Sequence, residues 1–461
     1  MSTATNTGWD RFRDDVLAAM RTGEVEQLDR RKWTAEQIQR EQRDRLQALL
    51  GHAAEHSPFH RRRLAGIDLA GVDPADLSAV PVMTKTQMMD ALDDVFTDRR
   101  LSRRGVESAL AATDGQPVPI LDDYIALASG GCSGNRGVFV FDRAAMASFA
   151  AAIARAPVEA PLPPDRLSGR PRFAFVAAAS AVHATGMFVA LTSSEHAPAQ
   201  FDAVPATLPL AGIVELLNTM QPRALRGYAS MLARLSAEAR AGRLQIKPSQ
   251  VSSTSETLLP EIRSALSQAF GVPVFDVFAC TEGLVGKTGP DTDVLVFNTD
   301  MCIVELVDAD NRPVTPGVPS TKVLITNLYN LTQPLIRYEL TDTFIRQPDA
   351  AEHGYLRARA QGRSDEVLHY DTADIHPITI RSVMVNTPHV SDYQIYQTRC
   401  GIDVFAVTTD EPQLDGLANR LRQALSDSGL GCPEVTVRPV ERLDRHPVTG
   451  KLRRFIPLTT T

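Results

Sequence analysis

The chain has 461 residues, of which 43% are hydrophobic and 22% charged, and its formal net charge is −7. This composition is that of an ordinary globular protein of about three domain lengths, and its acidic balance argues against a nucleic-acid-binding surface, which needs clustered Lys and Arg. The five cysteines stand far apart without a CxxC pair, which argues against a disulfide framework or a zinc site and is typical of a reduced, cytoplasmic protein.

One long uncharged stretch, Phe173–Leu191, needs to be distinguished from a membrane span. Because Ala, Ser, His, Thr and Gly interrupt it, we expect a buried strand, a polar loop and the start of a helix. Residues 1–15 lack the apolar core of a signal peptide. We therefore expect a cytoplasmic protein that binds neither a membrane nor nucleic acid.

Helical patterns dominate the first part of the chain, and strands then alternate with helices. Thr34 and Gln37 have capping-box spacing ahead of a helical pattern that Pro58 ends. A strand, a helix closed by glycine, and a buried strand are expected at Arg172–Ala178, Pro260–Gly271 and Val272–Phe278. The alternation predicts α/β layers. Later, Cys302–Val314 and Thr321–Asn330 read as a β pair joined by an "ADN" turn.

After Gly362 the pattern changes to β-α-β-β-α-β over roughly 95 residues. Strands are expected near 366–370, 392–399, 402–409 and 434–440, with helices near 377–386 and 413–428. The sequence thus predicts an α/β protein with a large N-terminal domain, residues 1–362, and a small α+β domain, residues 363–461.

The first segment that could carry chemistry is "SGGCSG", Ser129–Gly134, between two segments that look like strands. Glycine lets backbone N–H groups approach an anion, and serine hydroxyls add donors. The lysine of a Walker loop is missing. A plain hairpin turn and a phosphate-binding loop therefore stay open as alternatives.

Further polar side chains follow strand-like segments. Thr281 and Glu282 come after Val272–Phe278, where a carboxylate can hold Mg²⁺ on a phosphate. Asp342 follows "PLIRY" and can take a ribose diol. Lys451 stands in a late Pro, Thr and Gly turn, "PVTGK". Judged singly, Glu282 could be a solvated loop acid, and Lys451 one more basic residue of the tail.

Taken together and in order, six segments resemble the adenylate-forming superfamily of acyl-CoA synthetases, peptide-synthetase adenylation domains and luciferases. They are "SGGCSGNRG", "TSETL", "FACTE", "PLIRYELTD", "GRSDE" and "TGK". The resemblance is greatest to the phenylacetate–CoA ligase branch, whose opening also resembles "SPFHRRRLAGID" and "VPVMTKTQM" here. It covers residues 34 to 457.

The resemblance implies a role for each matching residue. The β- and γ-phosphates of ATP would be cradled by Ser129, Gly130, Gly131, Ser133 and Gly134. The remaining nucleotide contacts would come from Ser255, Glu256, Phe278, Asp342 and Arg363. Thr281 would touch the α-phosphate, Glu282 would hold Mg²⁺, and Lys451 would reach the α-phosphate and the carboxylate. Asp365 would be the hinge of a mobile small domain.

By the same resemblance, the acid-binding pocket would be lined by His183, Gly186, Tyr228, Ala279 and Cys280. These mixed small and apolar residues suit a planar aromatic or short acyl acid better than a long chain. For His183 two interpretations stay open: it binds the substrate, or it is a core histidine bonded to the backbone.

The implied reaction is ATP-dependent adenylation of a small carboxylic acid, followed by thioester formation with coenzyme A. We expect the acid to be aromatic. The acceptor is less securely implied, because Tyr370–Pro377 replaces the family's Gly-rich stretch along the thiol's approach and adds Asp371 and Asp374. The alternative is transfer to an amine or a carrier-protein thiol, or activation of nitrite for diazotisation. A non-catalytic nucleotide-binding protein is disfavoured by the set Glu282, Asp342 and Lys451.

Overall fold

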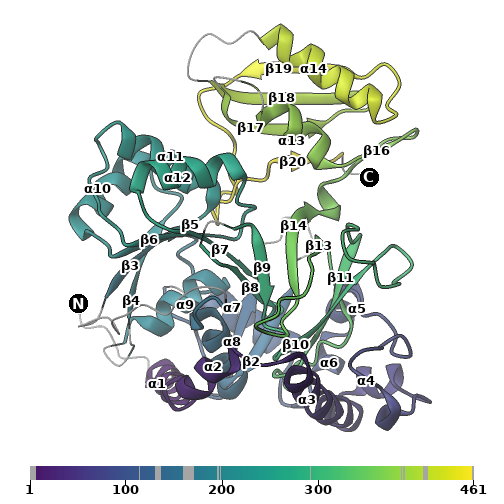
Figure 1. The fold of residues 1–461 in the computed structure, drawn as a ribbon. Helices are drawn as coiled ribbons and strands as arrows, with labels where there is room; N and C mark the ends of the chain where they lie inside the picture. The colour runs from purple at the N-terminus through teal and green to yellow at the C-terminus, as the bar shows by residue number, and fades with distance from the viewer. Residues whose placement is uncertain are drawn as a thin grey trace.

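The computed structural model describes residues 7–458 apart from 114, 130–135, 159–170, 195–196, 198, 291, 386, 388–389 and 409–413. Figure 1 shows helices of the first hundred residues at the base and a large twisted sheet in the middle. Above the large sheet stands a smaller unit, made of a small sheet and two helices. The sequence-based expectation of a large α/β part and a small α+β part is confirmed.

The base is formed by α1 (Thr7–Thr22), α2 (Glu24–Arg30), α3 (Ala35–His56), α4 (Pro58–Arg63), η1 (Leu69–Gly71), α5 (Lys85–Asp90), α6 (Leu92–Val95) and α7 (Arg103–Ala112). Helix α3 begins at the predicted capping box: the Gln37 backbone nitrogen donates to the Thr34 hydroxyl, and the Thr34 nitrogen donates to the Gln37 side chain. It ends before Pro58, which starts α4.

The large sheet has nine strands in the order β13-β14-β9-β8-β7-β6-β5-β3-β4. Its strands are β3 (Arg172–Ala177), β4 (Gln200–Pro205), β5 (Ala224–Gly227), β6 (Gln250–Thr254), β7 (Val274–Ala279), β8 (Val285–Thr288), β9 (Val294–Phe297), β13 (Asp342–Arg346) and β14 (Arg357–Arg363). Strands β3 to β7 are parallel, and the others are antiparallel. The carboxyl ends of the parallel strands therefore share one edge, the usual place for a ligand.

Four helices connect the parallel strands: α9 (Ala184–Thr192), α10 (Leu210–Met220), α11 (Ala229–Arg240) and α12 (Pro260–Phe270). Helix α12 ends at Gly271, whose φ of +66° is the left-handed cap expected from the sequence. The uncharged stretch divides into β3, a turn and α9, as predicted. In the part of the chain that the structure describes, no helix has both the length and the apolar character needed to cross a membrane.

Two smaller sheets complete the large part. One pairs β1 (Tyr124–Ala128) with β2 (Val138–Asp142), which leads into α8 (Arg143–Ala154). The other contains β10 (Cys302–Val307), β11 (Lys322–Asn327) and β12 (Tyr338–Leu340). The predicted pairing of β10 with β11 is confirmed. The expected "ADN" turn is only the first part of their connection, closed by Asp308 donating to the Arg312 carbonyl at 2.9 Å.

The small part contains η2 (Ser364–Glu366), β15 (Leu368–His369), β16 (Asp374–Ile375), α13 (Pro377–Val385), β17 (Val390–Gln397), β18 (Gly401–Thr408), α14 (Leu414–Asp427), β19 (Glu434–Pro439) and β20 (Phe455–Ile456). Its sheet has the order β19-β18-β17-β20. The expected first strand, 366–370, does not join this sheet. The Tyr370 nitrogen donates to Ala373 and folds that strand into a local hairpin, while buried Phe455 brings β20 to the edge position beside β17.

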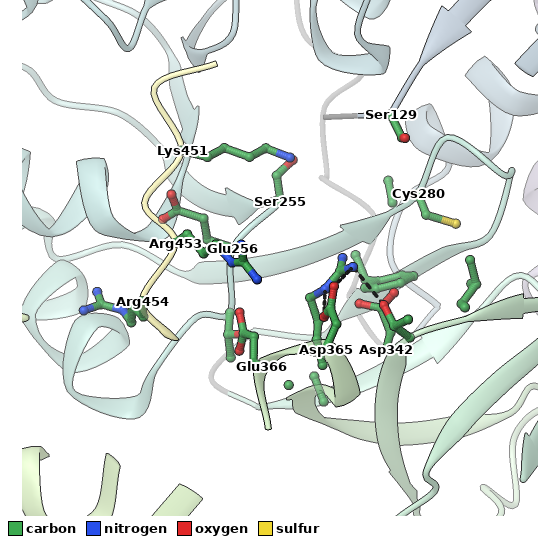
Figure 2. A pocket seen from close by; sticks show the side chains of 18 of the residues that line it. Ser129, Ser255, Glu256, Cys280, Asp342, Asp365, Glu366, Lys451, Arg453 and Arg454 are labelled. Atoms are coloured by element: carbon green, nitrogen blue, oxygen red, sulfur yellow. Dashed lines mark hydrogen bonds and ion pairs between the residues drawn. The ribbon is translucent and has the colours of Figure 1, made fainter. Parts of the chain in front are cut away.

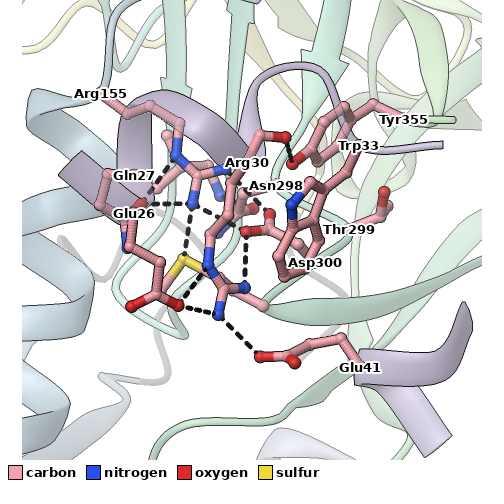
Figure 3. A network of polar contacts seen from close by, with 12 residues as sticks. Glu26, Gln27, Arg30, Trp33, Glu41, Arg155, Asn298, Thr299, Asp300 and Tyr355 are labelled. Atoms are coloured by element: carbon pink, nitrogen blue, oxygen red, sulfur yellow. Dashed lines mark hydrogen bonds and ion pairs between the residues drawn. The ribbon is translucent and has the colours of Figure 1, made fainter. Parts of the chain in front are cut away.

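A buried ionic network ties the base to the sheet (Figure 3). Asp300 is fully buried and accepts from Arg155 at 2.8 and 3.0 Å and from Arg30 at 3.3 Å. Arg30 also pairs with Glu41 of α3 at 2.9 Å, and its carbonyl accepts from the Tyr355 hydroxyl at 2.6 Å. Because each charge has a partner, the network fixes α2, α3 and α8 relative to one another without a bare buried ion.

Candidate active site

A cavity of about 700 Å³ lies where the strand ends of the large sheet meet the segment that carries Lys451 (Figure 2). The structure brings most of the predicted site residues to its wall: Ser129, Ser255, Glu256, Phe278, Ala279, Cys280, Thr281, Glu282, Asp342, Arg363, Asp365 and Lys451. The predicted residues Gly130, Gly131, Ser133 and Gly134 lie outside the described residues.

Ser129 marks where the candidate phosphate loop leaves β1. Its nitrogen donates to the Gly137 carbonyl at 2.9 Å, and its hydroxyl accepts from the Gly137 nitrogen at 2.8 Å. These bonds close the β1–β2 hairpin around the segment between them, while the Ser129 side chain stays on the cavity wall. Ser129 thus lies beside the cavity at the closed end of the β1–β2 pair, and the binding of phosphate by Ser129–Gly134 remains a prediction.

The loop that carries Glu282 is a tight β7–β8 turn. Cys280 and Leu284 pair across it at 3.1 Å, and Gly283 has a φ of +106°. Asn327 donates to the Glu282 carbonyl at 3.0 Å, and the Tyr329 hydroxyl donates to the Gly283 carbonyl at 3.0 Å. A Cβ at residue 283 would collide with both of these side chains. Only glycine therefore fits, and the turn holds Glu282 at the cavity wall.

Two acids face the same cavity. Glu282 is only 5% exposed, and burial raises the pKa of its carboxyl group. The positive charge of Lys85 opposes this rise, and the negative charge of Asp342 adds to it. Burial likewise raises the pKa of Asp342, against the effect of Arg363. Two acids held above their ordinary pKa values in one cavity favour the arrival of positive charge.

Glu282 could supply one carboxylate ligand to a Mg²⁺ ion. Within the described ranges, no three or more His, Cys, Asp or Glu side chains form a metal-binding group. Mg²⁺ is commonly held by one or two carboxylates together with substrate phosphates. The donor set here therefore suits a Mg²⁺ that arrives with a nucleotide rather than a resident metal.

Arg363 joins the predicted ribose-binding acid to the predicted hinge. It lies opposite Asp342 in the β13–β14 register. Its guanidinium makes a two-pronged pair with Asp365, at 2.8 and 2.9 Å, and donates to the Thr341 hydroxyl at 2.8 Å. Arg363 and Asp365 thus form one rigid unit at the end of β14, directly before the small part of the chain.

The Lys451 segment is fastened to the large domain. One oxygen of Glu256 accepts from the Leu452 nitrogen, and the other accepts from the Ser230 nitrogen at the start of α11, both at 2.9 Å. Arg445 donates to the Ser230 hydroxyl at 2.9 Å and to the Gly450 carbonyl at 3.1 Å. In Figure 2 the Lys451 side chain extends toward Ser255.

A second cavity, about 70 Å³, adjoins the first and shares with it Ser255, Val277, Ala279, Thr281 and Lys451. Of the residues predicted to bind the acid, His183, Tyr228 and Ala279 line it. The backbone-bonded interpretation of His183 is confirmed, because its Nδ1 contacts the Ala128 carbonyl at 3.1 Å, and its binding of the substrate stays a prediction. Burial lowers the pKa of His183.

The structure does not bring Gly186 and Cys280 to this second cavity. Cys280 lines the large cavity instead. Gly186 is needed for packing, since a Cβ there would collide with the Ser180 and Ala179 carbonyls under α9.

Six Lys and Arg residues on the two cavity walls were missed from the sequence: Lys85, Arg226, Arg381, Arg445, Arg453 and Arg454. Lys85 stands in "VPVMTKTQM". This segment was part of the family resemblance, but no function was assigned to any residue in it. For Arg226 the only signal was a charge inside a short strand pattern, "ALRG".

The fold is similar to that of adenylate-forming ligases, and the set of motifs is most similar to that of the phenylacetate–CoA ligase-like branch. No family model matches the chain. The chain is 21% identical over 386 residues to the phenylacetate-coenzyme A ligase of Aromatoleum evansii, with 80% of each chain covered. It is 24% identical over 132 residues to Protein CapK of Staphylococcus aureus, which spans 28% of each chain.

Among solved structures, the chain is similar to 2-hydroxyisobutyryl-CoA ligase in the postadenylation state with an acyl-AMP bound. The TM-score is 0.66 at 19% identity, over 93% of this chain and 91% of that one. An open conformation of the same ligase, bound to an acyl-AMP and CoA, has a TM-score of 0.55.

Proposed function

We propose that this chain is an adenylate-forming ligase for a small carboxylic acid. A carboxylate oxygen of the acid bonds to the α-phosphorus of ATP, the bond from that phosphorus to the β-phosphate bridge breaks, and pyrophosphate leaves. The acyl group then passes to the thiol of coenzyme A, and AMP is released. One observation carries the proposal: Lys451 lines both the large cavity and the small one, at the place where a nucleotide and an acid would meet.

The physical demand of this reaction is to align two anions. A lysine at the junction supplies positive charge where negative charge accumulates, and alignment supplies much of the remaining acceleration. Bound Mg²⁺ would add positive charge at the departing pyrophosphate, with Glu282 as its protein ligand. Asp342 would take the ribose hydroxyls. Phe278, packed edge-to-face on Phe344 with ring centroids 5.3 Å apart, would give the adenine a rigid apolar wall.

The second cavity supports a short acid over an aromatic one. Its volume is about 70 Å³, whereas a cavity of about 150 Å³ is known to hold benzene. A phenyl ring would need side chains to move, while a short acyl chain would not. Both classes belong in the first substrate panel.

Coenzyme A is the acceptor favoured by the similar proteins, since both the phenylacetate and the 2-hydroxyisobutyryl enzymes are named as CoA ligases. The altered stretch Tyr370–Pro377 forms the β15–β16 turn and leads into α13, with Asp371 and Asp374 exposed. An amine or a carrier-protein thiol remains the alternative acceptor.

The test is ATP–pyrophosphate exchange over aromatic and short aliphatic acids, and nitrite, with wild type, Lys451→Ala and the exposed-lysine control Lys247→Ala. We expect exchange with a narrow set of acids, its loss in Lys451→Ala and its retention in the control. Absence of exchange with every acid, despite ATP binding, would contradict adenylation. Adding coenzyme A to the active acid then tests the acceptor: AMP release without a thioester would point to another nucleophile.

A further inference from the structure

Arg226 places a positive charge in the wall of the small cavity. It is the third residue of β5, and its side chain lies between the rings of Phe175 and Phe201, with its guanidinium carbon 5.9 and 5.8 Å from their centroids. Its Nε donates to the Ser252 hydroxyl at 3.0 Å. The two terminal nitrogens have no hydrogen-bond partner among the described residues, so they are available to the cavity.

No carboxylate among the described residues pairs with this guanidinium. Asp202 of β4, which is separated from β5 by β3, pairs with Arg172 at 3.0 Å instead. Asp276 of β7 lies on the other face of the sheet, because the register aligns Arg226 with Ser252 and Phe275, and neighbouring residues on a strand point to opposite faces. Burial alone lowers the pKa of Arg226, to about 10, so it stays charged at neutral pH.

The nearby Lys287 shows by contrast how a buried amine obtains hydrogen-bond partners in this core, where burial lowers its pKa well below the ordinary value. It lies on the same face of the sheet, opposite Val277, and donates to the carbonyls of Ile153, at 2.5 Å, and Arg155 at the end of α8. Those carbonyls are the negative end of a helix. Lys287 therefore has its compensation within the fold, and Arg226 does not.

A half-buried charge without an ionic partner still has a desolvation cost, and an apolar side chain against the two phenyl rings would have no such cost. A counter-ion that enters the cavity would remove that cost. The second cavity is also lined by Lys451, which it shares with the large cavity, and by His183, but by no acid. A substrate that carries one anionic group toward Lys451 and another toward Arg226 matches this distribution of charge.

The distance from Arg226 to Ala279, which lines both cavities, limits the length of such a substrate. Arg226 is level with Phe275, four residues before Ala279 at the end of β7. At ~3.3 Å per residue this is ~13 Å of strand, part of which the arginine side chain itself spans. With a cavity of about 70 Å³, only a few methylene groups fit between the two anions.

We propose that the acid activated here is a short dicarboxylic acid, whose second carboxylate pairs with Arg226. This inference rests on the proposed adenylation for its place in the reaction. Arg226 sets specificity and takes no part in the chemical step: the charge-assisted bonds to the distal carboxylate form in the ground state and persist in the transition state.

The test compares malonate, succinate and glutarate with acetate, propionate, butyrate and phenylacetate in ATP–pyrophosphate exchange. The variant is Arg226→Met, which keeps an apolar chain between the two rings, and the matched control is Arg223→Met, an exposed arginine just before β5. We expect wild type to favour one dicarboxylate. Arg226→Met should lose about 100-fold or more in kcat/KM for that acid, mostly through KM, and gain relative preference for the monocarboxylate of equal length.

A second measurement separates this inference from the proposed function. In thermal denaturation without ATP, the favoured dicarboxylate should raise the Tm of wild type and of Arg223→Met, but not of Arg226→Met. Exchange with the favoured dicarboxylate that is unchanged in Arg226→Met, or wild-type exchange with monocarboxylates alone, would overturn the inference and leave adenylation intact. If no acid supports exchange, the proposed adenylation is wrong. If, in addition, none of the three dicarboxylates changes the Tm of wild type, the inference about Arg226 is wrong as well.

Discussion

Oε1 of Glu256 accepts a hydrogen bond from the backbone nitrogen of Leu452 at 2.9 Å, across 196 residues of sequence. Leu452 directly follows Lys451, so this bond sets how deeply the lysine reaches between the two cavities. The other oxygen of Glu256 is held by the Ser230 nitrogen, which fixes the carboxylate itself. Glu256, expected from the sequence to lie along the adenine, thus has a positioning contact as well as a place on the cavity wall.

The first prediction concerns this contact. Glu256→Ala should lower the rate of ATP–pyrophosphate exchange about tenfold or more, since a hydrogen bond to a charged group contributes ~1.5–3 kcal/mol. Amide hydrogen exchange at residues 449–454 should rise in the same variant. Glu261→Ala, which removes an exposed acid from the first turn of α12, is the control. Slower catalysis with unchanged protection at 449–454 would contradict a positioning role.

The second prediction uses two glycines with positive φ. Gly283→Ala should displace the Glu282 turn, because its Cβ would collide with Asn327 and Tyr329, and exchange activity should fall at least about 100-fold. Gly271→Ala also has an unfavourable φ of +66° but meets no atom within 4 Å. It should lose ~1 kcal/mol of stability with its activity retained. Equal activity of the two variants would show that the turn does not position Glu282.

The third prediction is a pH dependence of stability. Burial raises the pKa of Asp276 from 3.8 to about 7, so the folded state binds more protons than the unfolded state between these values. The contribution of this group to stability therefore falls as pH rises through that window. Asp276→Asn, which imitates the neutral acid, should raise Tm by about 2–4 °C at pH 8 and leave it unchanged at pH 4.

Calorimetry at the two pH values, with the exposed helix residue variant Asp44→Asn as control, checks this. A Tm gain at pH 4 equal to that at pH 8 would mean that the effect of the amide does not come from charge.

The fourth prediction concerns the buried network in Figure 3. Asp300→Asn leaves Arg30 and Arg155 without their shared carboxylate, and we expect a loss of about 3–5 kcal/mol in the free energy of unfolding. Urea denaturation measures this, and Asp44→Asn again serves as the exposed control. Because an apolar replacement of all partners removes the bare charges, Asp300→Leu combined with Arg30→Met and Arg155→Met should recover part of the loss. A triple variant as unstable as Asp300→Asn would contradict this account.

What the sequence predicted well depends on neighbouring residues. The capping box of Thr34 with Gln37 and the left-handed Gly271 both act within one turn of helix, so their signals survive in any context. The ordered set of motifs likewise located Thr281, Glu282, Asp342 and Lys451 around one cavity.

What the sequence could not provide depends on distant pairing. Strand 366–370 has a good local pattern, but its neighbour in the fold is β16, and the sheet edge goes to β20 from far along the chain. The isolation of Arg226 is likewise visible only when every acid around it has been located in space.

The segment after Lys451 changes from contacts with the large domain to contacts with the small domain within a single residue. Leu452 is bonded to Glu256 of the large domain, while Arg454 pairs with Asp392 of the small domain at 2.5 Å and its carbonyl accepts from Ile395 at 2.7 Å. Arg453 alone separates the two attachments, too little chain to act as slack. A rotation of the small domain, which remains a prediction, would therefore pull Lys451 out of the junction in the same movement. The arrangement with Lys451 at the junction and any arrangement with the small domain rotated would then exclude each other. The short connection through Arg453 is enough to impose this exclusion.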